Sequence, residues 1–248
     1  MKWLNYTNLS DEYERKARFL PAVLCLLPLL PASAALGGPV FEWLKLVLGG
    51  VGIGAVLAVG LSHVASAMGN RLQNRLWPRW PFDSPTNRWL HPKEERTSPQ
   101  QRAIWYAAIE RLVGIDIAVA VSGGNGLEAT INDATSQLRN LFWELPEAKR
   151  LRLHNGDYGF ARNITGMRPI WIGLLVASAL VCWVTYAMTD TTALLWAVVS
   201  SLFAVILIPV GICVLPGYVN TRAVYYAESF FATLMALDKA SVPSESAS

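Results

Sequence analysis

The sequence predicts an all-α membrane protein in which two transmembrane hairpins, four helices in all, flank a helical cytoplasmic domain. Of its 248 residues, 53% are hydrophobic and only 16% are charged, whereas a soluble domain carries about 25% charged residues. Four long apolar segments contain no charged residue. The 10 tryptophans fit the same class, because tryptophan accumulates at membrane–water interfaces.

The four apolar segments approach or exceed the ~18 residues needed to cross a hydrocarbon core about 30 Å thick. They are residues 19–36, 46–64, 170–188 and 193–215. The first ends in PASAAL, which resembles a signal-peptide cleavage site. Its prolines at 21, 28 and 31, and the acidic residues before it, favour a retained, kinked helix over cleavage.

The distribution of basic residues predicts the orientation. Residues 71–168 contain 14 of the 21 Lys and Arg residues, and such an excess is typical of cytoplasmic segments. Both termini are therefore expected in the cytoplasm. The predicted parts are an N-terminal cytoplasmic segment (1–18), hairpin 1 (19–64), a cytoplasmic helical domain (65–168), hairpin 2 (169–215) and a cytoplasmic C-terminal tail (216–248).

The second apolar segment is rich in small residues. Gly50, Gly54 and Ala58 recur every four residues, a pattern that permits close helix contact within the hairpin or around a subunit axis. Ser62 and His63 at its cytoplasmic end are candidates to line a pore, although His63 could simply extend to the interface. Since no span contains a charged residue, an ion-coupled transporter with a buried carboxylate relay is disfavoured.

Arginine and tryptophan alternate in the segment that follows. Arg79, Arg88 and Trp89 belong to this stretch, and guanidinium groups alternating with stacking rings suit the phosphates and bases of a nucleotide or of single-stranded nucleic acid. The alternative is a juxtamembrane belt, in which arginine meets lipid headgroups and tryptophan lies at the interface.

The rest of the cytoplasmic domain is predicted to be helical. One helix begins at Pro99, capped by Thr97 or Ser98. Residues 127–145 carry an apolar stripe that can pack within the domain or between subunits; it comprises Leu127, Ile131, Ala134, Leu138, Leu141 and Leu145. The GGNG turn before it lacks the Lys and Ser/Thr of a P-loop, so a plain loop is the favoured interpretation.

The stretch HNGDYGFARNITGMRPIW, residues 154–171, precedes the third span. Tyr158 and Arg162 lie one helical turn apart and could hold an anionic aromatic ligand, while Asn163 could read a base edge. The alternative is a structural elbow, in which Arg162 and Arg168 anchor to headgroups and Pro169 begins the span.

Two of these motifs, WPFDSPTNRWL (80–90) and NGDYGFARNITGMRP (155–169), resemble those of a family of bacterial four-span membrane proteins. The first departs from the family pattern, because Phe82, Asp83 and Ser84 stand where glycines are expected. The layout is similar to that of anti-phage membrane effectors of the Hailong type, which are paired with a nucleotidyltransferase. The resemblance implies a homo-oligomeric ion channel of the inner membrane, such as a tetramer, gated by a nucleotide-derived signal or a short single-stranded DNA oligomer.

The function expected from the sequence is therefore a ligand-gated pore, and the alternative is a non-conducting scaffold that recruits a partner through the 127–145 helix. No nucleophile–base pair, carboxylate pair or metal cluster is evident, so neither catalysis nor a cofactor is expected. The expected ligand-binding residues are Arg79, Arg88, Trp89, Tyr158, Arg162 and Asn163.

Overall fold

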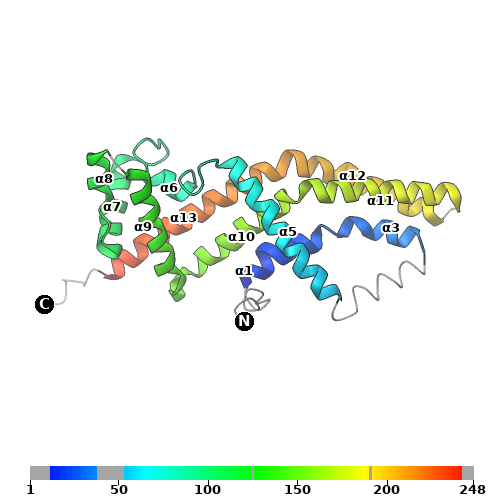
Figure 1. Cartoon of the computed structure of the whole chain (residues 1–248), viewed down its shortest axis with the longest axis horizontal. Coiled ribbons are helices and arrows are strands. Elements are labelled where there is room, and N and C mark those ends of the chain that lie inside the picture. Colours follow the sequence, from blue (N-terminus) through cyan, green and yellow to red (C-terminus); the bar gives the residue numbers. More distant parts are fainter. Residues whose placement is uncertain (1–11, 38–52, 125, 190–191, 242–248) are drawn as a thin grey trace. The chain divides into compact units, whose positions relative to one another are not determined.

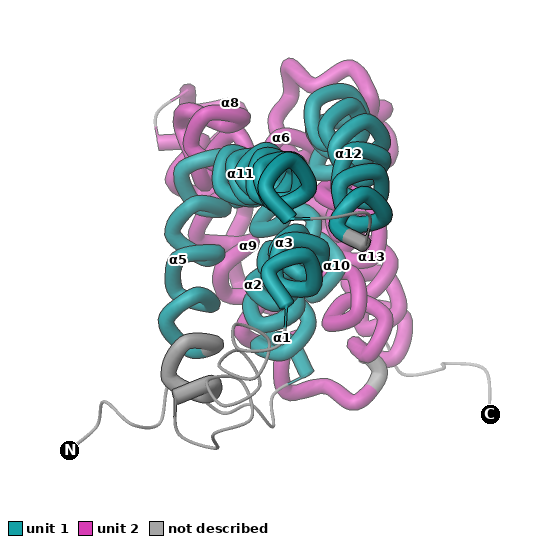
Figure 2. The backbone as a smooth tube through the Cα atoms, turned by 90° about the vertical axis from the view of Figure 1, so that its right-hand side faces the viewer, with its two compact units in different colours: residues 1–72, 156–220 teal, residues 73–155, 221–248 magenta. Residues whose placement is uncertain are grey.

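The computed structural model describes residues 12–37, 53–124, 126–189 and 192–241. Within these ranges the regular secondary structure is entirely helical, which confirms the all-α prediction. The chain forms two compact units, one of residues 1–72 and 156–220, the other of residues 73–155 and 221–248 (Figure 2). It passes between them within three helices: α5 (Ile53–Leu76), α10 (Lys149–Gly166) and α13 (Leu215–Ser241).

Unit 1 begins with a series of short helical elements. They are α1 (Glu12–Glu14), η2 (Arg15–Phe19), α2 (Leu20–Leu24), η3 (Leu27–Leu29) and α3 (Leu30–Ala35). Pro21, Pro28 and Pro31 each stand in the first turn of one of these elements. Proline has no backbone N–H to continue a preceding helix but is well tolerated in a first turn. The three prolines therefore explain why this span consists of short helical elements and not of one continuous α-helix.

Three helical segments of the described residues are long and apolar enough to cross a membrane, fewer than the four predicted. They are Glu12–Ala35, Arg168–Met188 and Ala193–Ser241. The predicted span without a counterpart among these three is 46–64, and its first seven residues lie outside the described ranges. Its described part belongs to α5, which continues beyond residue 64 into a polar stretch containing Arg71 and Arg75.

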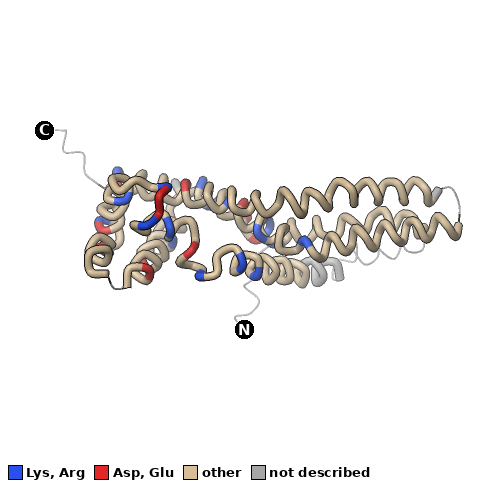
Figure 3. Tube along the Cα trace, turned by 90° about the horizontal axis from the view of Figure 1, so that it is seen from above, with Lys and Arg blue, Asp and Glu red and all other residues tan. Residues whose placement is uncertain are grey.

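The second half of unit 1 is an antiparallel pair of apolar helices, α11 (Arg168–Met188) and α12 (Thr192–Pro209), packed side by side (Figure 1). Arg168 is their only charged residue (Figure 3). A wider π-helical segment, η5 (Val210–Val214), follows Pro209, and the Trp171 indole fills the space that a side chain at position 211 would need. The Arg168 guanidinium donates to the Gly211 carbonyl at 3.2 Å.

Unit 2 consists of α6 (Pro85–Leu90), α7 (Pro99–Val113), α8 (Ile117–Gly123), α9 (Leu127–Trp143), η4 (Pro146–Ala148) and parts of α10 and α13. Ser98 caps α7 by accepting from the Gln101 N–H at 3.1 Å, in agreement with the predicted helix start. Ile131, Ala134 and Leu138 of the predicted apolar stripe are at most 2% exposed. The stripe of α9 therefore packs within the domain, in one core with α7 and α13.

Two glycines of the 154–171 stretch allow very close helix packing in unit 1. A Cβ added to Gly159 would lie 2.6 Å from the Ala17 Cβ, and one added to Gly166 would lie 2.6 Å from the backbone of Met68 and Gly69 in α5. Real Cβ atoms do not approach so closely, so larger residues would force the elements apart.

We predict that Gly166→Ala lowers the free energy of unfolding by about 1–3 kcal/mol, because the added methyl meets rigid backbone rather than a movable side chain. The matched control is Gly173→Ala, where an added Cβ meets nothing within 4 Å and alanine improves helix propensity. Denaturant titration in detergent, followed by circular dichroism, measures both. Equal stabilities for the two variants would contradict the close approach.

Candidate functional site

The structure divides the six predicted ligand-binding residues between the two units. Arg79, Arg88 and Trp89 belong to unit 2, and a group of three from the 154–171 stretch belongs to unit 1. The two groups are therefore considered separately. The first of them borders a sizeable cavity.

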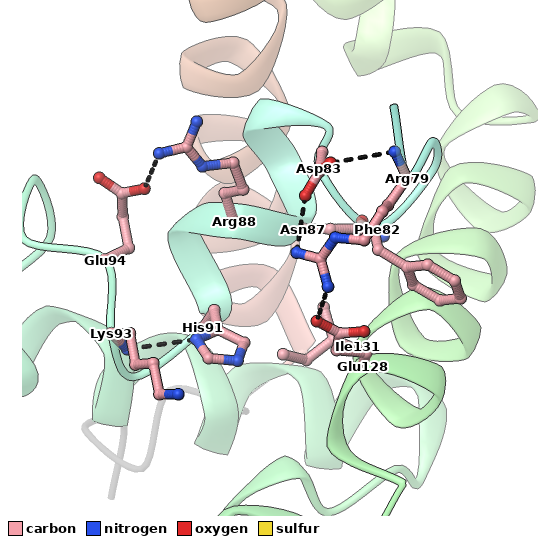
Figure 4. Close-up of a pocket in the computed structure, with 10 residues that line it drawn as sticks. All are labelled: Arg79, Phe82, Asp83, Asn87, Arg88, His91, Lys93, Glu94, Glu128 and Ile131. Carbon is pink, nitrogen blue, oxygen red and sulfur yellow. Dashed lines mark hydrogen bonds and ion pairs between the residues drawn. The ribbon is translucent and has the colours of Figure 1, made fainter. Parts of the chain in front are cut away.

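A charged cavity of about 310 Å³ lies in unit 2 where the segment 79–94 faces α9 (Figure 4). Arg79 and Arg88 both line it, so the structure brings together two of the predicted residues. The other lining residues are Phe82, Asp83, Asn87, His91, Lys93, Glu94, Glu128 and Ile131. Four of the ten side chains are basic or imidazole groups and three are carboxylates, which gives the cavity both cationic and hydrogen-bond-accepting walls.

Helix α6 positions one side of this cavity through a buried polar anchor. Asn87 is 3% exposed, and its Oδ1 accepts a hydrogen bond of 2.8 Å from the fully buried Thr135 hydroxyl of α9. The helix starts at Pro85 and is capped by Ser84, whose Oγ accepts from the Asn87 N–H. These bonds fix α6 on α9, so that Arg88, one residue further, projects outward with 56% of its side chain exposed.

The two arginines are held by carboxylates at the surface. Arg79 forms ion pairs of 2.8 Å with Asp83 and with Glu128, and Arg88 forms one of 3.0 Å with Glu94. Hydrogen bonds that its guanidinium donates to Glu128 and Asp83 raise the pKa of Arg79, which therefore stays charged. The Arg79 and Arg88 side chains are 62% and 56% exposed, so both guanidinium groups are accessible to an anionic ligand, although their partners Asp83 and Glu94 are only 20% and 10% exposed.

His91 and Lys93 complete the cationic side of the cavity. The Lys93 N–H donates to His91 Nδ1 at 3.2 Å, and the Lys93 ammonium makes no ion pair within the described ranges. Partial burial lowers the pKa of His91. The charge of Glu128 raises this pKa, and the charges of nearby cations lower it further. The imidazole is thus neutral at pH 7, and since Nδ1 accepts, Nε2 carries the proton and can donate to a ligand.

Trp89 lies in an aromatic cluster on another side of α6. Its ring is nearly parallel to those of Trp105 and Phe231, with centroids 6.4 Å and 5.8 Å away. A separate cavity of about 380 Å³ borders Trp89, Trp105 and Arg96. The structure therefore places Trp89 in the wall of the core, away from the cavity that Arg79 and Arg88 line.

The three residues predicted from the 154–171 stretch form a packing junction in unit 1. Asn163 is fully buried, and its Nδ2 donates to the Ala17 carbonyl at 2.6 Å. Arg162 donates from Nε to Asn163 Oδ1 at 3.1 Å and lies over the Tyr158 ring, 5.8 Å from its centroid. These polar groups are engaged with protein partners, and both the ligand-binding role and the headgroup-anchoring elbow remain predictions.

The residues predicted for the pore or for helix packing belong to the second apolar segment. Gly50 lies outside the described ranges, and Gly54 and Ala58 lie in α5. Ser62 donates to the Val59 carbonyl of its own helix at 2.8 Å, and His63 is exposed. Whether these residues line a pore remains a prediction.

Several contributors to the cavity were not identified from the sequence, among them Asn87, His91, Lys93 and Glu128. The helix start at Ser84-Pro85 is a local signal that could have placed Asn87. His91 and Lys93 come from the loop after α6, and Glu128 comes from α9, 49 positions from Arg79. No local pattern connects residues that far apart.

A scan against protein-family models, a search of curated proteins and a search of solved structures find no match to this chain. Across the ranges that the structure describes, no group of three or more His, Cys, Asp or Glu residues is arranged to hold a metal ion. The chemistry of the charged cavity is therefore the basis for assigning a function.

We predict that Thr135→Val destabilises the protein by about 1–3 kcal/mol, because Asn87 Oδ1 would lose its hydroxyl donor in a buried position. Thr130→Val in the same helix is the control, since the Thr130 hydroxyl donates only to the Gly126 carbonyl at the exposed helix start. Denaturant titration in detergent measures the difference. A Thr135→Val protein as stable as the control would show that this anchor contributes nothing.

We also predict a pH dependence that comes from His91. Because folding lowers its pKa, the neutral imidazole stabilises the folded state above the unfolded pKa of about 6.5, and this contribution is lost as the pH falls through the folded value. The unfolding temperature of the native protein should therefore drop more between pH 7.5 and pH 5 than that of His91→Gln. Identical pH profiles would contradict the assignment.

Proposed function

We propose that the chain is a membrane effector in which unit 2 binds a small nucleotide-derived signal in the charged cavity. In this proposal the apolar helices of unit 1 form, as a homo-oligomer such as a tetramer, an ion-conducting pore of the bacterial inner membrane that the signal gates. The proposal rests on the cavity lined by Arg79, Arg88, His91 and Lys93, together with three apolar helices of membrane-spanning length among the described residues.

The mixture of charges in the cavity favours a nucleotide over a simple anion. Arg79, Arg88 and Lys93 supply three positive charges, and Asp83, Glu94 and Glu128 supply three negative charges. One guanidinium group can donate two parallel hydrogen bonds to the oxygens of a phosphate. Carboxylates repel a bare phosphate, but they accept hydrogen bonds from the ribose hydroxyl or base amino groups that a nucleotide also carries.

The apolar helices support the membrane part of the proposal. Large side chains of α11 and α12 are exposed along much of their length, for example Leu180 (61%), Leu195 (61%) and Val205 (70%). Such a surface must be covered by lipid or by other copies of the chain. Ser200 and Ser201 donate to the Ala197 carbonyl of their own helix, as an apolar environment requires.

The anti-phage role is proposed from the resemblance of the 80–90 and 155–169 motifs to Hailong-type effectors. It implies that a partner nucleotidyltransferase makes the signal and that the effector permeabilises the membrane in response. The nucleotide or short DNA oligomer would then be bound on the cytoplasmic side, where both termini are also expected. This effector acts by binding and conduction, without catalysis.

A second candidate is a non-conducting scaffold that recruits a protein partner. The apolar stripe of α9 is buried, so it does not offer the docking surface expected from the sequence. Helix α8 favours this candidate instead, because its Val119 and Val121 are 64% and 37% exposed.

We predict that purified protein in liposomes conducts ions when a short single-stranded DNA oligomer or a cyclic nucleotide is added. Arg88→Ala and Lys93→Ala should each weaken the response about tenfold or more, since each removes a charge-assisted hydrogen bond of about 1.5–3 kcal/mol. The control is Arg150→Ala, an exposed arginine of unit 2 outside the cavity.

If protein that is inserted and folded shows no ion flux under any condition, the pore is contradicted and the scaffold is favoured. A response that is equally strong in Arg88→Ala, Lys93→Ala and the control would instead remove the charged cavity from the ligand site.

A further inference from the structure

We propose that the site in unit 2 has two compartments, and that the second one holds a nucleobase attached to the anionic group bound in the first. This inference rests on the proposed function, because it assumes that the charged cavity is the anion site. Beyond the proposed function, the inference names the nucleobase as the part of the ligand that gives specificity, and it names the residues that recognise this base.

A second cavity of about 650 Å³ adjoins the charged one. Phe82, His91, Lys93 and Glu128 line both cavities, so the two cavities are neighbours that share one wall. Beyond these shared residues the second cavity is bordered by Pro92, Val121 and Leu127, which makes it the more apolar of the two.

The shared residues suit the junction between a phosphate-bearing sugar and a base. Phe82 is 36% exposed, and its ring lies at the edge of the charged cavity (Figure 4), where it can stack on a planar group. His91 is neutral with its Nε2 proton free to donate, for the reasons given above. Glu128 can accept from an amino or hydroxyl group even while it pairs with Arg79.

The apolar residues explain why a base fits better than a second charged group. Val121 is 37% exposed in α8, and Leu127 is partly buried at the start of α9. A planar ring between these side chains and Phe82 would cover apolar surface now in water, and stacking on an aromatic side chain tolerates any base. Another phosphate placed there would have only Lys93 to neutralise it.

Binding of a small set of probes to the full-length protein in detergent tests this arrangement. The probes are inorganic phosphate, ribose 5-phosphate, adenosine 5′-monophosphate and octyl phosphate, titrated calorimetrically. Adenosine monophosphate should bind about tenfold or more tightly than ribose 5-phosphate, and Phe82→Ala should remove most of this difference.

A second variant guards against a folding defect, since Phe82 lies in a tight turn. Val121→Ser changes only an exposed residue and should reduce adenosine monophosphate affinity several-fold, whereas Val119→Ser on the same helix, which lines neither cavity, should leave it unchanged. Phe82→Trp should retain the preference for the nucleotide.

The possible failures are distinguishable. Equal affinities of adenosine monophosphate and ribose 5-phosphate would overturn the two-compartment site and leave the anion site standing. Tighter binding of octyl phosphate than of the nucleotide would overturn the base assignment in favour of an alkyl group. The absence of binding for every probe would overturn both this inference and the ligand part of the proposed function.

Discussion

The buried amide of Asn163 is the interaction on which the packing of unit 1 depends. It donates to the Ala17 carbonyl of η2, and its Oδ1 lies where any side chain at Gly69 of α5 would have to stand. A buried polar group that lost these partners would cost about 1–3 kcal/mol. One side chain therefore requires a glycine opposite it and fixes α5, η2 and α10 together, which explains why special residues crowd the stretch before the third span.

In unit 2 a buried asparagine amide also joins two helices, but here the residues near it include charged groups at the surface. Asn87 is buried against Thr135, so α6 is fixed on α9 by a side-chain amide, but its neighbours in sequence stay at the surface. Arg79 and Arg88 keep more than half of their side chains exposed, so their guanidinium groups can reach a ligand without any movement of the framework that Asn87 fixes. A rigid polar anchor beside exposed charged groups is what a binding site needs.

Local patterns in the sequence predicted local structure well. The stripe from Leu127 to Leu138 has the helical period, so the helix α9 followed from spacing, whereas its packing within the domain rather than between subunits did not. The Ser98-Pro99 helix start is a signal of adjacent residues. The count of four spans was less accurate, because it depends on where a helix lies in three dimensions, and so does the division of the six predicted ligand-binding residues between two units. Arg162 and Arg88 look alike in sequence, yet one contacts Asn163 beside it and the other borders a cavity.

The balance of charges around the cavity decides which ligands it can select. Its three basic side chains are matched by three carboxylates, and His91 adds no charge because burial lowers its pKa. A simple anion would gain from the guanidinium groups but would meet the carboxylates as well, so net attraction at a distance is small. A ligand that carries hydroxyl or amino donors beside its phosphate satisfies both signs at once. In the proposed function, the cavity would therefore discriminate by matching donors and acceptors at short range, which is what a receptor for one nucleotide signal among many cellular phosphates requires.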